Sequence, residues 1–137
     1  MFDTLDISAS GLQAQRTRMD TIAANIANIN STRDADGKPN PFRRRFAAFA
    51  SGLSAKGPDA HKPGVHVQDI EQDPSPFTRK FEPGHKDAGP DGYVLYPNID
   101  LSVEFVNALE ASRAYEANVT MMEVSKAMIN ASLRLLA

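Results

Sequence analysis

The chain has 137 residues, the length of a single domain, and its 17 acidic residues nearly balance its 15 lysines and arginines. The balanced charge gives no general attraction to nucleic acid, and the absence of cysteine excludes disulfides and thiolate metal ligands. No run approaches the roughly 18 consecutive apolar residues of a membrane span, so we expect no direct membrane span. The first residues contain neither a basic leader nor an unbroken apolar run, so we expect no cleaved signal peptide.

Proline and glycine divide the chain into three parts. All nine prolines lie between Pro39 and Pro97, and glycine is concentrated in nearly the same interval. Because both residue types interrupt helices, this distribution predicts a helix at each end and an irregular middle. We expect a mainly α fold in which an N-terminal helix (1–32) and a C-terminal helix (99–137) pair as an antiparallel coiled coil. The part between them (33–98) is expected to be a small β-containing, loop-rich central insert.

The first helix is expected over residues 2 to about 30. One column of residues spaced by seven is apolar throughout, whereas a second column is polar in its first half. Gly11 weakens this half further, by about 1 kcal/mol relative to alanine. The apolar column consists of Leu5, Leu12, Met19 and Ile26, and the second column of Ser8, Gln15, Ile22 and Ile29.

Asparagines interrupt the last turns of this helix. Asn25 and Asn28 lie on neighbouring turns, where their amides can bond across to other helices. Alternatively, Asn28 and Asn30 simply end the helix, because the asparagine side chain competes for backbone hydrogen bonds. The residues alone leave both interpretations open.

The insert is expected to contain a few short extended segments. Its residue pattern predicts strands over 42–50 and from 65 to about 71, separated by a flexible polar link over 51–64. Further extended pieces are expected over 77–84 and 93–96. With so few apolar residues, the insert forms at most a small β-rich patch.

The last helix is expected over residues 101–136, which contain no proline or glycine, with Asp100 as its N-cap. Residues spaced by seven from Leu101 are all apolar, and the column four residues on alternates between apolar and polar. So narrow a seam, on a helix of roughly 50 Å, requires a helical partner. The first column is Leu101, Ala108, Tyr115, Met122, Ile129 and Leu136, and the second is Phe105, Ser112, Val119, Lys126 and Leu133.

No residue pattern indicates catalysis, a metal site or a cofactor, so we expect no enzyme and no cofactor. His61, His66 and His85 lack partners at metal-ligand spacing, and no nucleophile elbow, phosphate loop or dinucleotide-binding glycine pattern is present. A small soluble enzyme is one alternative, and a single-stranded nucleic-acid-binding module using the arginines at 43–45 is another. The ten basic and nine acidic residues of the insert disfavour the second, because they give no broad basic field.

Both ends of the chain resemble the flagellar rod and hook axial protein family. The N-terminal run LDISASGLQAQRTRMDTIAANIANINSTR resembles the family's opening helix with its asparagine motif, which Asn25 and Asn28 match. The C-terminal run from YPNID to LRLL resembles the family's closing helix. Its core is matched by Arg113, Tyr115, Glu116 and Asn118. The short insert and the stretches FRRRFAAF and GVHVQDI look most like a proximal rod subunit, with another rod or hook subunit as the alternative.

The resemblance implies a structural subunit whose paired terminal helices pack beside those of its neighbours in the wall of a tubular rod. This drive shaft transmits torque, encloses the export channel and lies in the periplasm as part of the basal body. The implied partners are copies of the chain itself, other rod subunits, the MS ring or an export-gate adaptor, and the flagellar type III export apparatus. The residues expected to pack within the helix pair or between subunits are Leu5, Leu12, Met19, Ile22, Asn25, Ile26, Asn28, Ile29, Leu101, Phe105, Arg113, Tyr115, Glu116, Asn118, Val119, Met122, Ile129 and Leu133.

Overall fold

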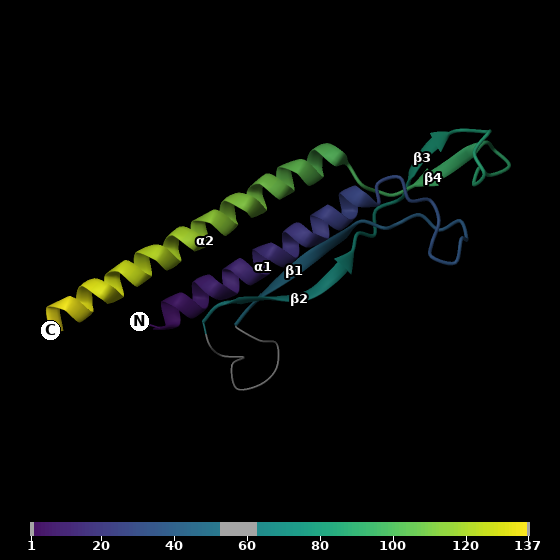
Figure 1. The fold of residues 1–137 in the computed structure, drawn as a ribbon. Coiled ribbons are helices and arrows are strands. Elements are labelled where there is room, and N and C mark those ends of the chain that lie inside the picture. Colours follow the sequence, from purple (N-terminus) through teal and green to yellow (C-terminus); the bar gives the residue numbers. More distant parts are fainter. Residues whose placement is uncertain (1, 53–62, 137) are drawn as a thin grey trace.

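The computed structural model describes residues 2–52 and 63–136 and places a helix at each end of a small β-containing insert, as the sequence predicts (Figure 1). Much of the predicted polar link over 51–64, including His61, lies outside the described residues. In chain order the elements are α1 (Phe2–Ala27), β1 (Arg45–Ser51), β2 (Val65–Gln72), β3 (Thr78–Phe81), β4 (Tyr93–Tyr96) and α2 (Leu101–Leu136).

The first helix ends three residues earlier than the periodicity predicts, and Asn28 is the reason. Its backbone N–H bonds to the carbonyls of both Ala24 and Asn25, which tightens the last turn. Its side-chain amide donates to the Ala24 carbonyl at 2.8 Å and accepts from the Ser31 hydroxyl at 3.1 Å. Asn28 therefore closes its own helix, as one of the two sequence interpretations proposed.

The second helix has the bounds that the sequence predicts, and Asp100 is its N-cap. The Asp100 carboxylate accepts hydrogen bonds from the backbone N–H groups of Ser102, at 2.8 Å, and Val103, at 3.4 Å. These donors belong to the first turn and have no partner within the helix. The absence of proline and glycine lets the helix run uninterrupted for 36 residues.

The helices and the first hairpin form three layers, with α1 in the middle (Figure 1). On one side α1 packs against α2, and on the other it packs against the antiparallel pair β1–β2. The β1–β2 register runs from Arg45↔Gln72 to Ser51↔Val65, with an irregularity between Ala48 and Phe49. α2 is therefore covered on one side only.

The second hairpin, β3–β4, stands beyond one end of the helix pair (Figure 1). Its antiparallel register runs from Thr78↔Tyr96 to Phe81↔Tyr93. Among the described elements, neither strand packs against a helix or against the first hairpin. A two-stranded sheet is marginal by itself in water, so the surrounding loops must hold it in place.

Very little apolar surface is buried within the described residues. The buried apolar side chains are few: Ala14, Ile22, Val94, Pro97, Ile99 and Ala111. A core of this size contributes little of the hydrophobic free energy that normally stabilises a domain. Within 2–52 and 63–136, neither helix combines the length and the apolar character needed to cross a membrane.

Asp87, in the loop between β3 and β4, ties the second hairpin to the segment that follows α1. Its side chain is 5 % exposed and accepts hydrogen bonds from the Arg33 guanidinium and the Thr32 hydroxyl, both at 2.9 Å. The Arg33 hydrogen bond, followed by the Thr32 bond and the Arg33 charge, holds the pKa of Asp87 below its usual range.

This contact makes the position of the second hairpin sensitive to acid. Because the pKa of folded Asp87 is lowered, the contact contributes fully above the unfolded value of about 4 and is lost as pH falls through the folded value. We expect an NMR titration to show Leu95 and Thr32 amide shifts changing together below about pH 4. In an Asp87→Asn variant the shifts should already be displaced at neutral pH and lack this transition. Identical titrations of the two proteins would contradict the assignment.

Candidate functional site

The contact between α1 and α2 combines small and polar residues with half-buried apolar ones. A Cβ atom on Gly11 would lie 2.9 Å from the side-chain amide of Asn118, so a larger residue there requires the Asn118 side chain to move. The Arg18 guanidinium bonds to the Glu110 carboxylate at 3.1 Å, and Asn25 Nδ2 bonds to Glu104 Oε2 at 3.1 Å. From each contact to the next, the residue number rises on α1 and falls on α2.

The residues of α2 that face α1 differ in part from the predicted columns. The residues of the predicted first column are largely half-buried. The second column that faces α1 lies three residues after the first column, whereas the sequence predicts a spacing of four residues. Phe105 and Leu133, predicted in the second column, are 54 % and 59 % exposed. The buried or half-buried residues at steps of four and three are Glu104, Ala108, Ala111, Tyr115, Asn118, Met122, Ser125, Ile129 and Ser132.

This correction has a physical cause. Periodicity counts apolar residues, whereas the true second column is polar or very small. Glu104 and Asn118 are accommodated because α1 places Asn25 and Gly11 opposite them. A polar seam residue can be recognised only once its partner on the other helix is known.

The predicted packing residues fall into three groups by exposure. Two are buried, namely Ile22 and Asn25. The half-buried ones are Leu5, Leu12, Met19, Ile26, Asn28, Ile29, Tyr115, Asn118, Val119, Met122 and Ile129. The exposed ones are Leu101, Phe105, Arg113, Glu116 and Leu133. The half-buried and buried groups lie mainly along the helix contact, and the exposed group is open to other molecules.

The two motif asparagines have different roles. Asn25 reaches out of its helix to α2, through Glu104, and to β1, where it accepts from Arg45 N at 3.0 Å and donates to Arg45 O at 2.7 Å. Asn28 bonds only locally, at the end of α1. The expectation that an asparagine bonds across to another element therefore holds for Asn25 and not for Asn28.

Sequence reasoning missed Glu104, the largest fully buried polar side chain among the described residues. The Glu104 side chain is fully buried, and its Oε1 atom accepts from Arg44 Nε at 2.6 Å. An acidic residue in the first turn of a helix is ordinarily an exposed group near the positive end of the helix dipole. The sequence alone therefore does not indicate that Glu104 is buried. Arg44 also contacts Asp73, with 3.4 Å between Nη1 and Oδ2.

The arginines at 43–45 are engaged in contacts within the chain. Arg43 lies over the Phe77 ring at 4.3 Å and donates to the carbonyls of Asp73 and Ser75. Arg44 pairs with Glu104, and the Arg45 guanidinium lies 5.1 Å from the centre of the Phe42 ring. Contacts of this kind occupy the groups that a single nucleic-acid strand would need, which disfavours the nucleic-acid alternative.

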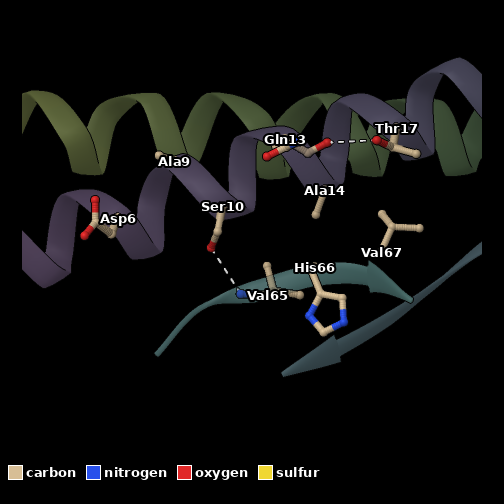
Figure 2. A pocket seen from close by; sticks show the side chains of 9 residues that line it. All are labelled: Asp6, Ala9, Ser10, Gln13, Ala14, Thr17, Val65, His66 and Val67. Atoms are coloured by element: carbon tan, nitrogen blue, oxygen red, sulfur yellow. Dashed lines mark hydrogen bonds between the residues drawn. The ribbon is translucent and has the colours of Figure 1, made fainter. Parts of the chain in front are cut away.

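Small side chains on α1 let the first hairpin approach closely (Figure 2). Ser10 accepts a hydrogen bond from Val65 N at 3.1 Å, and Ala14 lies near Val67. The hollow between the two elements, of about 370 Å³, is open and lined by polar and apolar groups alike. His66, on β2, lies 3.0 Å from the Gly52 carbonyl through Nδ1, which is a structural contact.

No metal-binding cluster is present among residues 2–52 and 63–136. No three histidine or acidic side chains of these ranges converge in a way that could hold an ion. His85, the other described histidine, accepts from Asp87 N at 3.1 Å and so shapes its own loop.

The exposed side of α2 is the most unusual surface of the described chain. Monomeric proteins seldom leave so many large apolar side chains of one element open to water. Those at least two-fifths exposed are Leu101, Val103, Phe105, Val106, Leu109, Met121, Val124, Met128, Leu133, Leu135 and Leu136. We call this set the α2 outer surface. Of the described residues of α2, only Glu104 and Ala111 are buried within the chain itself.

Comparisons with known proteins agree with this arrangement. Residues 5–33 match the family model described as "Flagella basal body rod protein", and residues 91–135 match the one described as "Flagellar basal body rod FlgEFG protein C-terminal". These two matches cover α1 and α2 almost completely.

Relatives named "Flagellar basal-body rod protein FlgC" are similar along nearly the whole chain. The one from Borreliella burgdorferi is 39% identical over 99% of this chain and 97% of its own. Those from Bacillus subtilis and Salmonella typhimurium are 37% and 33% identical, over 98% of this chain and 97% of theirs. The chain therefore belongs to the FlgC family of flagellar basal-body rod proteins, and it is a structural subunit of the rod and not an enzyme.

Proposed function

We propose that this chain assembles into the proximal rod of the flagellar basal body, the drive shaft that transmits torque and encloses the export channel. The helix pair of each subunit forms one segment of a tubular wall. The α2 outer surface packs against the helices of neighbouring subunits, which are copies of the chain and other rod subunits.

The observation that carries this proposal is the α2 outer surface itself. Phe105, Val106 and Leu109 are 54 %, 64 % and 62 % exposed, within two turns of one another. Burying such side chains contributes about 1.5–3 kcal/mol each, which the isolated chain forgoes. Nothing in the described fold covers them, so the covering surface has to come from other subunits.

The terminal helices pair as an antiparallel coiled coil in this proposal. The contacts Gly11–Asn118, Arg18–Glu110 and Asn25–Glu104 support it, because their residue numbers run in opposite directions. The division into an N-terminal helix part, a central insert and a C-terminal helix part, at 1–32, 33–98 and 99–137, follows from this pairing. All eighteen residues named above as packing residues belong to the pair or to its contacts with neighbours.

The location and the route to it follow from the same proposal. The rod part lies in the periplasm, and the chain reaches it through the flagellar type III export apparatus without a cleaved signal peptide. The MS ring or an export-gate adaptor is a further proposed partner at the base of the rod. Torque passes between neighbouring subunits through the helix contacts. The insert is bonded to both helices and makes each subunit more rigid.

Phe105→Asp tests the outward contacts. Phe105 is exposed, so the change leaves the fold of the single chain intact but places a charge where the neighbouring subunit packs. In cells lacking the native copy, we expect loss of swimming and loss of the variant from isolated basal bodies, with export of the chain unchanged. Thr120→Asp, an equally exposed site on α2, is the matched control and should support swimming. Normal motility of the Phe105 variant would contradict the proposed contact.

Gly11→Leu tests the pairing of the two helices. The larger side chain collides with Asn118 and forces the helices apart. Overpacking of this kind costs about 1–3 kcal/mol, so incorporation into basal bodies should fall about tenfold. Combining Gly11→Leu with Asn118→Gly should restore part of the loss, because the clash is relieved. Gln13→Leu, an exposed position on the same helix, serves as control. Equal incorporation of the Gly11 and Gln13 variants would show that the helices do not meet here.

A further inference from the structure

The Glu104 carboxylate lies where three parts of the chain meet. It is fully buried near the start of α2. Its Oε2 atom accepts from Asn25 of α1 at 3.1 Å, and its Oε1 atom accepts from Arg44, just before β1, at 2.6 Å. Each oxygen therefore has one partner, and the two partners come from different segments.

These partners are themselves fixed in place. Asn25 also exchanges two hydrogen bonds with the Arg45 backbone, at 2.7 and 3.0 Å. The Arg44 backbone N–H donates to Asn98 Oδ1 at 2.9 Å, and its guanidinium contacts Asp73. The side chains of Asn25, Arg44 and Glu104, which we call the Glu104 cluster, are thus held by α1, the insert and α2 together.

Apolar packing does not by itself select one register for the two helices. α2 has 36 residues and α1 has 26, so α1 remains opposed to α2 along its whole length after a shift of one heptad toward the end of α2. The shift would place Gly11 opposite Ser125 and Asn25 opposite Ala111, and both of these α2 residues are small. A second feature must therefore distinguish the two registers.

We propose that Glu104 is the register-determining residue of the helix pair. In the native register its carboxylate meets Asn25 and Arg44, and in the shifted register it meets neither. After the shift Asn25 faces Ala111 and Arg44 loses its carboxylate partner, so two hydrogen bonds to a charged group are lost and the cluster penalises the wrong register. This is the role that single buried polar residues have in other coiled coils.

The inference rests on the proposed pairing of the helices and adds the residue that selects its register. The ion pair between α1 and α2, Arg18–Glu110, provides a contrast. Its side chains are 24 % and 67 % exposed, so water replaces either partner at little cost. It therefore serves as a control in which an arginine and a glutamate are removed from an exposed contact between the helices.

Cross-linking between single cysteines reports the register, because the native chain has no cysteine. Gln15 lies between Gly11 and Arg18, and Ala114 lies between Glu110 and Asn118, so the pair Gln15→Cys with Ala114→Cys reports the native register. The pair Gln15→Cys with Met121→Cys reports the shift by one heptad. A short bis-maleimide links each pair in basal bodies isolated from cells and, in parallel, in the purified full-length chain. Links within one chain are separated from links between chains by mass.

The ion pair of the cluster is then made apolar by Arg44→Met and Glu104→Leu together, and Asn25 is kept because it also bonds to the Arg45 backbone. Apolar replacement of a buried ion pair usually preserves stability, so we expect the pair to form but the ratio of shifted to native cross-links to rise about tenfold. Glu104→Gln, which keeps the shape and removes the charge, should move the ratio in the same direction. Arg18→Met with Glu110→Leu should leave it unchanged.

Two results would overturn the inference: an unchanged ratio in both cluster variants, or an equal rise in the Arg18–Glu110 control. These outcomes differ from a failure of the proposed function itself. If neither cysteine pair cross-links within the otherwise native chain, the helix pairing is wrong and the inference falls with it.

Discussion

A thin, polar contact between two long helices is the constraint on which the structure depends. Gly11 lets α1 approach Asn118 closely, and Asn25 and Glu104 meet where the helices join the insert. Such a contact buries little apolar surface and stabilises through directed hydrogen bonds. Its advantage is specificity, because each polar group has a partner in only one arrangement.

The same constraint explains the exposed side of α2. Since α2 contributes Ala111, Asn118 and Ser125 to the seam beside a few apolar residues such as Met122, many of its large apolar residues lie elsewhere on its surface. Residues such as Phe105 and Leu109 are then available to neighbouring subunits. One side of α2 therefore packs within the subunit, and the other side is available to pack against neighbouring subunits in the wall of the rod.

Much of this was predictable from the residues. The proline-free ends predict both helices, and Asp100 predicts the start of α2, because capping and helix interruption are local effects. Within the single chain Glu104 is buried and Phe105, which apolar periodicity favoured, is exposed. A buried carboxylate depends on Asn25 and Arg44, which are distant in sequence, and no local pattern relates the three.

The insert acts as a brace for the helices. β1 lies against α1, and Arg44, just before β1, bonds to Glu104 at the start of α2. Asn98 joins Arg44 to the segment that follows β2. The second hairpin is held through Asp87, Thr32 and Arg33, away from the helix contact. Rigid connections of this kind suit a subunit that carries torque, because they couple both helices to one body.

The central claim is that the α2 outer surface is covered by other subunits in the rod. Hydroxyl-radical labelling of side chains, compared between the free full-length chain and isolated basal bodies, tests it most directly. The account predicts strong labelling of Phe105, Leu109 and Met128 in the free chain and strong protection of the same residues in the rod. Equal labelling of these side chains in both states would contradict it.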